Sequence, residues 1–480
     1  MKLLPFSMTL LLASTLVFAD DGAQFSRNVS KTPDWDTEHT SLRQLLLYVP
    51  ATSSDGDTTT IDYFSPDDTL LETRDQARPL IAFYEDGPVE PTSEEDGGFY
   101  GHGERDMYAA VSFDDGTTWK RTNLSRSADK SSISIQVPFK KKTKAVPYPG
   151  DVFRNFTTSA GTRAVAVWAS RYCNGGNPNY TLETDERDAL AAYLGIASED
   201  MYLNDIWGVA GSQKIKDFAE EDYPSVGQVP YACLWAARGT LELDADTGLP
   251  EMVWRQAERL TSGVRDAHRM ETACVPGVGC VITWQEDPEG LRPGKGEGPG
   301  EGWSGAIAHH ETDIWYSYIS WSHFDLVAGD PSPIPLADYT GDEAPKVGVP
   351  FSMPMRLTDN AMCKEGIDED SPGYHAYCYV DFDDNGSSDN CADSADINTE
   401  GGSIEMCVTE DGRLLRGNTA STRARTHLRG LDSDDDGIFD KAFVIMGYEE
   451  SKGLGEEDDD AGDKYDMGKN IWYHTFDMFN

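Results

Sequence analysis

The chain contains 480 residues, and its 84 acidic residues outnumber its 40 basic residues to give a formal net charge of −44. A charge of this size excludes nucleic acids and anionic membrane surfaces as partners, because the protein repels polyanions. It favours contact with divalent cations or a salty habitat, and we interpret most of the acidic residues as solvated surface.

The first 19 residues have the pattern of a secretory signal peptide. Lys2 supplies the basic start, an apolar run extends from Leu10 to Phe18, and the small residue Ala19 fits a cleavage site. The run is too short to cross a bilayer, and the acidic pair Asp20-Asp21 follows at once. Since no later stretch reaches a spanning length, we expect a secreted or periplasmic protein without a transmembrane segment.

Short runs of aromatic and β-branched residues recur between clusters of Gly, Pro, Asn and Asp, whereas long helical periodicity is scarce. This pattern predicts an all-β chain. The repeating unit is a strand that ends in an aromatic residue and a polar or acidic tip. It occurs six times, at residues 81–86, 165–171, 232–238, 281–287, 375–381 and 443–450.

Several of these runs are followed by a polar loop and a second aromatic strand, at residues 106–111, 313–319 and 470–476. A strand, a variable loop and a strand at recurring intervals are typical of a propeller blade, in which each small sheet buries both faces against its neighbours. A β-sandwich is the alternative, but sandwiches rarely repeat one strand signature six times. We therefore predict a six-bladed β-propeller. The predicted domains are the signal peptide at 1–19, an N-terminal extension at 20–40 and a single propeller with long inter-strand loops at 41–480.

Residues 112–119 form the motif Ser-x-Asp-x-Gly-x-Thr-Trp directly after a predicted strand. Its defining residues are Ser112, Asp114, Gly116, Thr118 and Trp119. We expect Asp114 to accept backbone hydrogen bonds across a turn in which Gly116 adopts an unusual dihedral, while Trp119 packs between adjacent sheets. The expected role of the motif is structural.

This motif matches the Asp box, or bacterial neuraminidase repeat, so the chain resembles the sialidase-like propellers. In that family the box lies on the rim, away from the ligand face. The resemblance implies an arginine triad that holds a substrate carboxylate, a tyrosine nucleophile assisted by a glutamate, and an aspartate acid/base. The family's Phe/Tyr-Arg-Ile-Pro motif is replaced here by Ala-Arg-Pro-Leu at residues 77–80, so no catalytic residue is carried over.

Several strand tips carry side chains that a propeller would direct at its central axis. The axial-face candidates are Glu85, Arg171, Arg238, Glu286, Tyr448 and Glu449. Four further arginines lie nearby, namely Arg154, Arg163, Arg265 and Arg269. Either the arginines converge on the axis or, as we favour, they pair with surplus carboxylates. The glutamates at 85, 286 and 449 align across three repeats, which suits a site for a cation or for sugar hydroxyls.

Two loops follow the Asp-x-Asp-x-Asp/Asn-Gly pattern, in which alternate residues turn hard oxygens inward and glycine permits a sharp bend. One loop contains Asp432, Asp434, Asp436 and Asp440, and the other contains Asp381, Asp383, Asn385 and Asp389. Phe443 and Ala392 occupy the twelfth positions, where an EF-hand has glutamate, so the loops resemble the dockerin or thrombospondin type-3 pattern instead. We expect a structural calcium cofactor. A solvated acidic turn is the alternative.

Eight cysteines in an exported chain predict up to four disulfides. Cys274 and Cys280 are the predicted pair, because the Val-Pro-Gly-Val-Gly between them is typical of a tight turn. The pairing of the others stays open, and they are Cys173, Cys233, Cys363, Cys378, Cys391 and Cys407.

These features favour an exported, calcium-stabilised propeller that binds an extracellular glycan or protein on its axial face without catalysis. The alternative is a glycoside hydrolase of sialidase-like architecture with a diverged active site, which needs arginine, tyrosine and paired carboxylates around the axis. A structural surface module without an axial pocket is a third hypothesis.

Overall fold

The computed structural model describes residues 28–88, 104–139, 142–174, 212–221, 226–288, 290, 312–326, 351–352, 354–358, 393–399, 402–408, 421–450 and 470–478. Within these ranges the regular structure is β-strand apart from two 3-10 helices, η3 (Phe218–Glu221) and η5 (Trp321–His323). The predicted all-β class is confirmed. No helix in the described ranges has the length and hydropathy needed to span a membrane.

Four antiparallel sheets carry most of the chain. Sheet 1 comprises β1 (Trp35–Gln44), β6 (Leu80–Pro88), β7 (Asp106–Ser112) and β8 (Lys120–Asn123). Sheet 2 comprises β11 (Val152–Ala160), β12 (Arg163–Ser170), β15 (Cys233–Leu243) and β16 (Pro250–Trp254), with β17 (Glu258–Arg259) beside β15. Sheet 3 comprises β18 (Asp266–Val275), β19 (Gly279–Asp287), β20 (Asp313–Ser320) and β21 (Met355–Arg356). Sheet 4 comprises β24 (Ser421–Leu431), β25 (Lys441–Glu450) and β26 (Asn470–Asp477).

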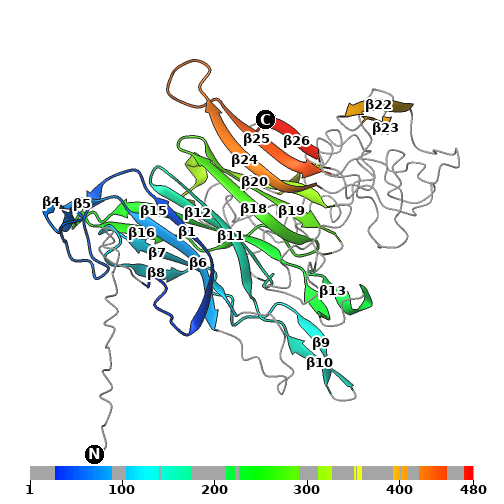
Figure 1. The fold of residues 1–480 in the computed structure, drawn as a ribbon, viewed down its shortest axis with the longest axis horizontal. Coiled ribbons are helices and arrows are strands. Elements are labelled where there is room, and N and C mark those ends of the chain that lie inside the picture. The colour runs from blue at the N-terminus through cyan, green and yellow to red at the C-terminus, as the bar shows by residue number, and fades with distance from the viewer. Residues whose placement is uncertain are drawn as a thin grey trace, which may run out of the picture.

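Five two-stranded ribbons accompany these sheets. They are β2 (Val49–Pro50) with β5 (Gln76–Ala77), β3 (Ile61–Phe64) with β4 (Leu70–Arg74), β9 (Ser134–Phe139) with β10 (Lys142–Pro147), β13 (Ile215–Asp217) with β14 (Gln228–Pro230), and β22 (Asp393–Thr399) with β23 (Gly402–Val408). Figure 1 shows sheets 1 to 4 following one another across the molecule in chain order, with the ribbons at their margins.

Consecutive sheets pack face to face because the second strand of each sheet is apolar on both sides. In β12, Ala164, Ala166 and Trp168 belong to the core shared with sheet 1. The intervening residues, Val165 and Val167, belong to the core shared with sheet 3. Sheet 3 repeats this arrangement between sheets 2 and 4. Two-sided burial of this kind requires a neighbour on each side.

The same backbone hydrogen bond joins each sheet to the next. A residue at the start of the first strand donates its N–H to the carbonyl of the residue just before the third strand of the preceding sheet. The three bonds are Val152 to Arg105 at 3.0 Å, Ala267 to Ala232 at 3.2 Å and Ser421 to Thr312 at 2.8 Å. Sheets 1 to 4 therefore form a regular succession of repeats.

The strand signature does not count sheets as the sequence suggested. Residues 165–171 and 232–238 fall on β12 and β15, which are neighbours in sheet 2 with Trp168 opposite Trp235. Two adjacent strands buried on both faces have the same composition, so the pattern cannot separate them. Residues 375–381 lie outside the described ranges. The signature strands that are described thus belong to four sheets.

The predicted second strands at 106–111, 313–319 and 470–476 are confirmed, since β7, β20 and β26 pair with β6, β19 and β25. Strand β1 begins at Trp35, so part of the predicted extension at 20–40 contributes to sheet 1. The predicted signal peptide at 1–19 lies outside the described residues.

Two disulfides are present in the described ranges. Cys274 and Cys280 are bonded and lie opposite each other in the β18–β19 hairpin, as predicted. Cys173 and Cys233 form the second disulfide, across a separation of 60 residues. Cys363, Cys378 and Cys391 lie outside the described residues.

We predict that the long-range disulfide contributes more stability than the short one. By loop-closure entropy, removing the Cys173–Cys233 crosslink with a double alanine substitution lowers the free energy of unfolding by about 4 kcal/mol, against about 2 kcal/mol for Cys274–Cys280. Urea denaturation under non-reducing conditions measures both losses. A smaller loss for the Cys173/Cys233 variant than for the Cys274/Cys280 variant would contradict the prediction.

Candidate ligand site at the bulged inner strands

The first strand of each sheet is interrupted by a β-bulge near its start. The pairing register shifts after Glu38 in β1, after Phe153 in β11, after His268 in β18 and after Thr422 in β24. At each shift one residue adopts a left-handed backbone. These bulge residues are His39 (φ 46°), Arg154 (φ 53°), Arg269 (φ 49°) and Arg423 (φ 55°).

A left-handed residue other than glycine costs roughly 1–2 kcal/mol, and such strain gathers at functional sites. Here it recurs at the corresponding point of four strands. Since the first strands of successive sheets contact one another, the four bulges lie along one end of the sheet stack. The repetition identifies this end as the candidate ligand site.

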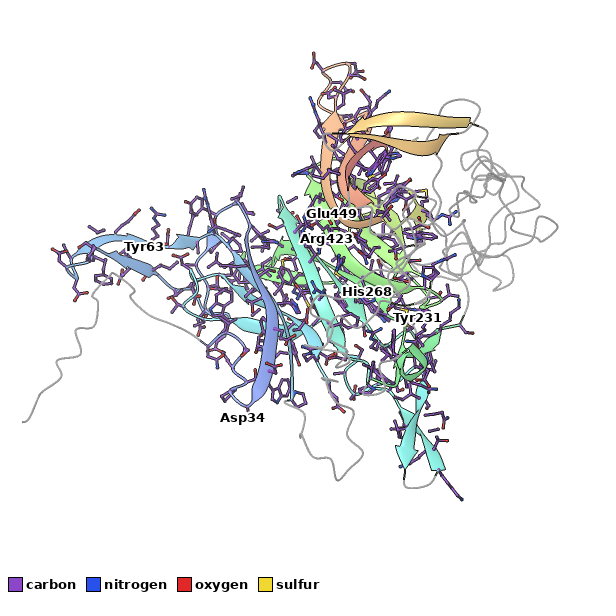
Figure 2. All side chains as sticks on the ribbon, turned by 45° about the vertical axis from the view of Figure 1, so that its right-hand side comes forward. Asp34, Tyr63, Tyr231, His268, Arg423 and Glu449 are labelled. Atoms are coloured by element: carbon purple, nitrogen blue, oxygen red, sulfur yellow. A yellow bond between two sulfur atoms is a disulfide. The ribbon has the colours of Figure 1, made fainter. Side chains whose placement is uncertain are left out.

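Three of the four bulge residues are arginines close enough to affect one another electrostatically. Burial, followed by the positive charges of Arg423 and Arg154, lowers the pKa of Arg269 to about 10. Arg154 and Arg423 are exposed, whereas Arg269 is half-buried. Glu449 accepts two hydrogen bonds from Nη1 of Arg423, at 3.0 and 3.2 Å, and the pair is labelled in Figure 2.

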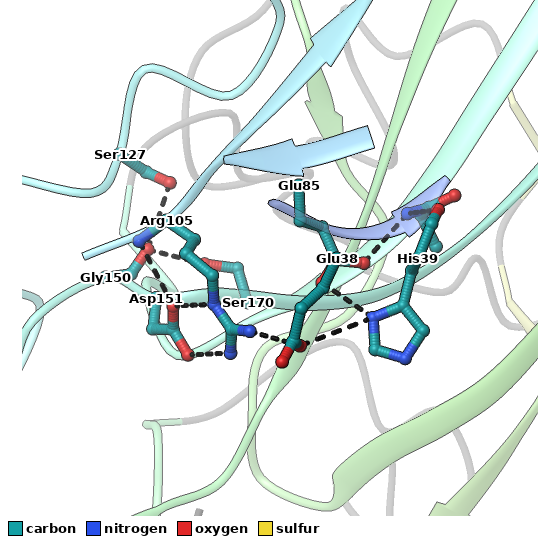
Figure 3. Close-up of polar contacts among 9 residues, drawn as sticks. Glu38, His39, Glu85, Arg105, Ser127, Gly150, Asp151 and Ser170 are labelled. Carbon is teal, nitrogen blue, oxygen red and sulfur yellow. Dashed lines mark hydrogen bonds and ion pairs between the residues drawn. The ribbon is translucent and has the colours of Figure 1, made fainter. Parts of the chain in front are cut away.

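The fourth bulge residue, His39, lies among carboxylates (Figure 3). Its Nδ1 is 3.0 Å from Oε2 of the fully buried Glu85 and 3.7 Å from Oε2 of Glu38. The side-chain amide of Asn155 donates to Oε1 of Glu85 at 2.8 Å and to the His39 carbonyl at 3.0 Å. Asn155 follows bulge residue Arg154, so this network joins sheets 1 and 2.

A buried ion pair supports the same junction (Figure 3). Arg105 donates from Nε and Nη2 to the two carboxylate oxygens of Asp151, each at 3.1 Å, and from Nη1 to Glu38. Burial raises the pKa of Asp151 to about 6, although the positive charge of Arg105 opposes the rise. Because Glu38 is also held by Arg105, the Glu38–His39–Glu85 group is already neutralised by protein cations.

The axial-face candidates divide between this end and other locations. Glu85 and Glu449 are brought to bulge residues of their own sheets. The corresponding position in β19 is Gln285, opposite His268, and not Glu286. The alignment predicted for Glu286 is therefore displaced by one residue, which in a strand moves the side chain to the opposite face. Glu286 accepts a hydrogen bond from Trp284 at 2.9 Å, and burial raises its pKa to about 8.

The other three candidates are buried in the sheet stack. Arg171 lies 3.2 Å from Asp266, at the start of β18. Arg238 pairs with Glu258 and lies opposite Val165, toward the other end of β12. Tyr448 is 3% exposed and packs in the core between sheets 3 and 4. The favoured interpretation, pairing with carboxylates, therefore describes Arg171 and Arg238.

The turn at residues 112–119 is held by its own side chains. Asp114 accepts hydrogen bonds from the Thr118 N–H at 2.8 Å and its hydroxyl at 2.6 Å, and from the Ser112 hydroxyl at 2.8 Å. Gly116 has φ 86°, and its carbonyl accepts from Nε1 of Trp119 at 2.9 Å. This turn lies at the opposite end of sheet 1 from Glu85.

Trp119 packs differently from our expectation. Its described apolar neighbours, among them Ala82, Tyr84 and Ala110, belong to sheet 1 itself. These residues alternate with Ile81 and Phe83, which face sheet 2. The indole therefore covers the face of sheet 1 that points away from sheet 2.

The acidic loop at 432–440 joins β24 to β25, at the end of sheet 4 opposite Arg423. Carboxylate oxygens of Asp432, Asp434 and Asp440 lie within 4.8 Å of one another. Asp432 also accepts a hydrogen bond from the Gly437 N–H at 2.7 Å, and Gly437 has φ 87°. The second predicted loop, with Asp381, Asp383, Asn385 and Asp389, lies outside the described residues.

Comparisons with known proteins give low similarities. No family model matches the chain, and no curated protein matches its sequence. A structure of Trypanosoma rangeli sialidase with sialic acid aligns over 86% of this chain at 10% identity and a TM-score of 0.21, and this chain spans 57% of that chain's length. A Fusarium graminearum α-L-arabinofuranosidase aligns over 91% of this chain and 98% of its own, at 8% identity and a TM-score of 0.17. A Penicillium chrysogenum α-L-arabinanase has the same coverage, at 10% identity and a TM-score of 0.15.

The sequence contained a signal for the bulge residues that our interpretation did not use. Asp-x-x-Arg-x-x-Thr occurs at residues 151–157 and again at 266–272, and Arg-x-x-Thr occurs at 423–426. Each begins the first strand of a sheet. The strand tips examined earlier belong to second strands, so Arg423 and His39 were missed.

We predict that His39 titrates above its ordinary pKa. The hydrogen bond to Glu85 raises the pKa of His39, and burial opposes the rise. Its protonated form therefore stabilises the fold below pH 6.5, and this contribution is lost as the pH rises through the raised value. NMR titration of the imidazole should give a midpoint above 6.5 that falls in Glu85→Gln. A midpoint at or below 6.5 in the wild type would contradict the assignment.

Proposed function

We propose that this chain is an exported, sialidase-like, six-bladed propeller that binds an extracellular glycan or protein ligand through the bulged ends of its inner strands. The ligand group that the site suits is a carboxylate. The observation that supports this most is the convergence of Arg154, Arg269 and Arg423 from three successive sheets.

Three guanidinium groups near one another favour an anion. The lowered pKa of Arg269 means that its charged form is penalised by burial and by the arginines beside it. A bound carboxylate reverses that penalty, because guanidinium groups donate paired hydrogen bonds that match its geometry. The net charge of −44 is no obstacle for a small ligand, since salt screens distant charges within about 10 Å.

The succession of sheets supports the propeller part of the proposal. Sheets 2 and 3 bury both faces, and one backbone link is repeated at three junctions. A radial array continues this relation from one sheet to the next. The Asp-box turn then lies at the end of sheet 1 away from the bulges, where the resemblance places it.

A binding role without catalysis suits the position of Tyr448. A sialidase-like mechanism needs an accessible tyrosine nucleophile, and this phenol is covered by the core between sheets 3 and 4. One observation favours the hydrolase alternative, namely the carboxylate pair Glu38 and Glu85 on either side of His39. Glycoside hydrolases use such pairs.

We predict that single arginine substitutions weaken carboxylate binding. With N-acetylneuraminic acid and D-glucuronic acid as probes in calorimetric titrations, Arg269→Gln or Arg423→Gln should lower affinity about tenfold to hundredfold, the value of a charge-assisted hydrogen bond. Arg429→Gln is the matched control, because Arg429 is exposed on the same strand six residues further on. Equal affinities in all variants would refute the site. Hydrolysis of a fluorogenic glycoside of either probe would favour the hydrolase alternative.

We also propose that the loop at 432–440 binds calcium and stabilises the β24–β25 hairpin. The gathered carboxylates of Asp432, Asp434 and Asp440 provide the hard oxygens that calcium requires, and Gly437 permits the sharp bend. The loop lies at the end of sheet 4 away from Arg423, so the ion would have a structural role.

Calorimetric titration with calcium should show binding to the wild-type protein and a loss of that binding in Asp434→Ala/Asp436→Ala, because two of the alternating oxygens are removed. Asp67→Ala/Asp68→Ala, in the exposed β3–β4 turn, is the control. Identical heats for the wild type and the 434/436 variant would dispose of the calcium proposal.

A further inference from the structure

The position that faces the next sheet beside each bulge differs in chemistry between junctions. At the junction of sheets 1 and 2 it is Glu85, which is satisfied by Asn155 of the next inner strand. At the junction of sheets 2 and 3 it is Ala169, which packs in the same apolar core as Met270. In both cases the position is either fully hydrogen-bonded or apolar, as buried positions usually are.

At the junction of sheets 3 and 4 this position is Gln285. Its β19 neighbour Thr283 shares a hydrogen bond of 2.7 Å with Thr426 of β24, so the side chains on this face of β19 point to sheet 4. The residue of β24 that follows the bulge residue, as Asn155 does in β11, is Ala424. A methyl group there cannot receive or donate a hydrogen bond.

The amide of Gln285 is consequently buried without a partner. Gln285 is 1% exposed, and neither its Nε2 nor its Oε1 has a hydrogen-bond partner. The Oγ1 of Thr422, directly before bulge residue Arg423, is also buried and unpaired. An unpaired buried amide costs roughly 1–3 kcal/mol, and the other junctions show that the fold does not require one here.

The charge at this position is also unusual. In sheets 1 and 4 the position holds a glutamate that pairs with the bulge residue of its own sheet, as Glu85 does with His39 and Glu449 with Arg423. In sheet 3 the residue is neutral, and it lies opposite His268, the residue before Arg269. The glutamine therefore offers hydrogen bonds to a ligand beside Arg269 without adding a negative charge.

We propose that Gln285 forms a neutral subsite beside the arginine site, where its amide hydrogen-bonds a hydroxyl or amide group of the ligand. This inference rests on the proposed carboxylate-binding function and specifies its ligand class. The ligand is an acidic sugar, in which a neutral polar group lies near the carboxylate. A simple carboxylate lacks that group.

The test compares N-acetylneuraminic acid with acetate in calorimetric titrations. Gln285→Met preserves the size of the side chain but removes its hydrogen bonds, so it should weaken binding of the sugar about tenfold and leave acetate unchanged. Gln285→Glu should weaken both probes at least tenfold, because its charge competes for Arg269. Glu85 and Glu449 show that glutamate is accommodated at this position of the fold.

Thermal unfolding separates this role from a purely structural one. If Gln285 binds ligand, the Met variant unfolds at the same or a higher temperature than the wild type while its affinity for the sugar falls. Unchanged sugar affinity, or an equal loss for sugar and acetate, would overturn the subsite while leaving the arginine site intact. Absence of binding of both probes to the wild type would overturn the proposed function and the subsite together. Gln76→Met, exposed on β5, controls for the substitution itself.

Discussion

Sheets 2 and 3 have two apolar faces, and an apolar face is stable only when another surface covers it. Trp168 and Trp284 are both almost fully buried, and each contributes to a core that two sheets share. This two-sided burial fixes which sheet follows which, and it aligns the first strands so that their bulges lie at one end. The position of every side chain at the candidate site depends on that packing.

The rigid stack explains how unfavourable features persist at the bulges. Four left-handed residues and a group of mutually repelling arginines are held by strands whose remaining residues are paired and buried. The buried carboxylates of Glu85 and Asp151 neutralise the junction of sheets 1 and 2. Toward sheet 4 the balance shifts to positive charge, with Arg423 and Arg425 exposed. A strongly acidic protein thus concentrates cationic groups where its inner strands begin.

The two ends of the sheets differ in composition. The end away from the bulges carries turns that satisfy themselves, such as the one built around Asp114, and the acidic loop that contains Asp432. The bulged end carries exposed arginines and an unpaired amide at Gln285. Unsatisfied groups and strain therefore gather at one end, while the other end is closed by local hydrogen bonds, which agrees with a division between ligand binding and structural support.

The sequence by itself determined the all-β class, the paired aromatic strands and the Cys274–Cys280 hairpin disulfide, because side-chain alternation and turn composition act over a few residues. The tertiary structure decided that residues 165–171 and 232–238 share one sheet, that Cys173 pairs with Cys233, and that Gln285 takes the place expected for Glu286. Each of these depends on strand pairing over long separations, and a bulge that inserts one residue changes the register on which any alignment of strand tips relies. The convergence of Arg154, Arg269 and Arg423 follows from the stacking of whole sheets, which no local pattern encodes.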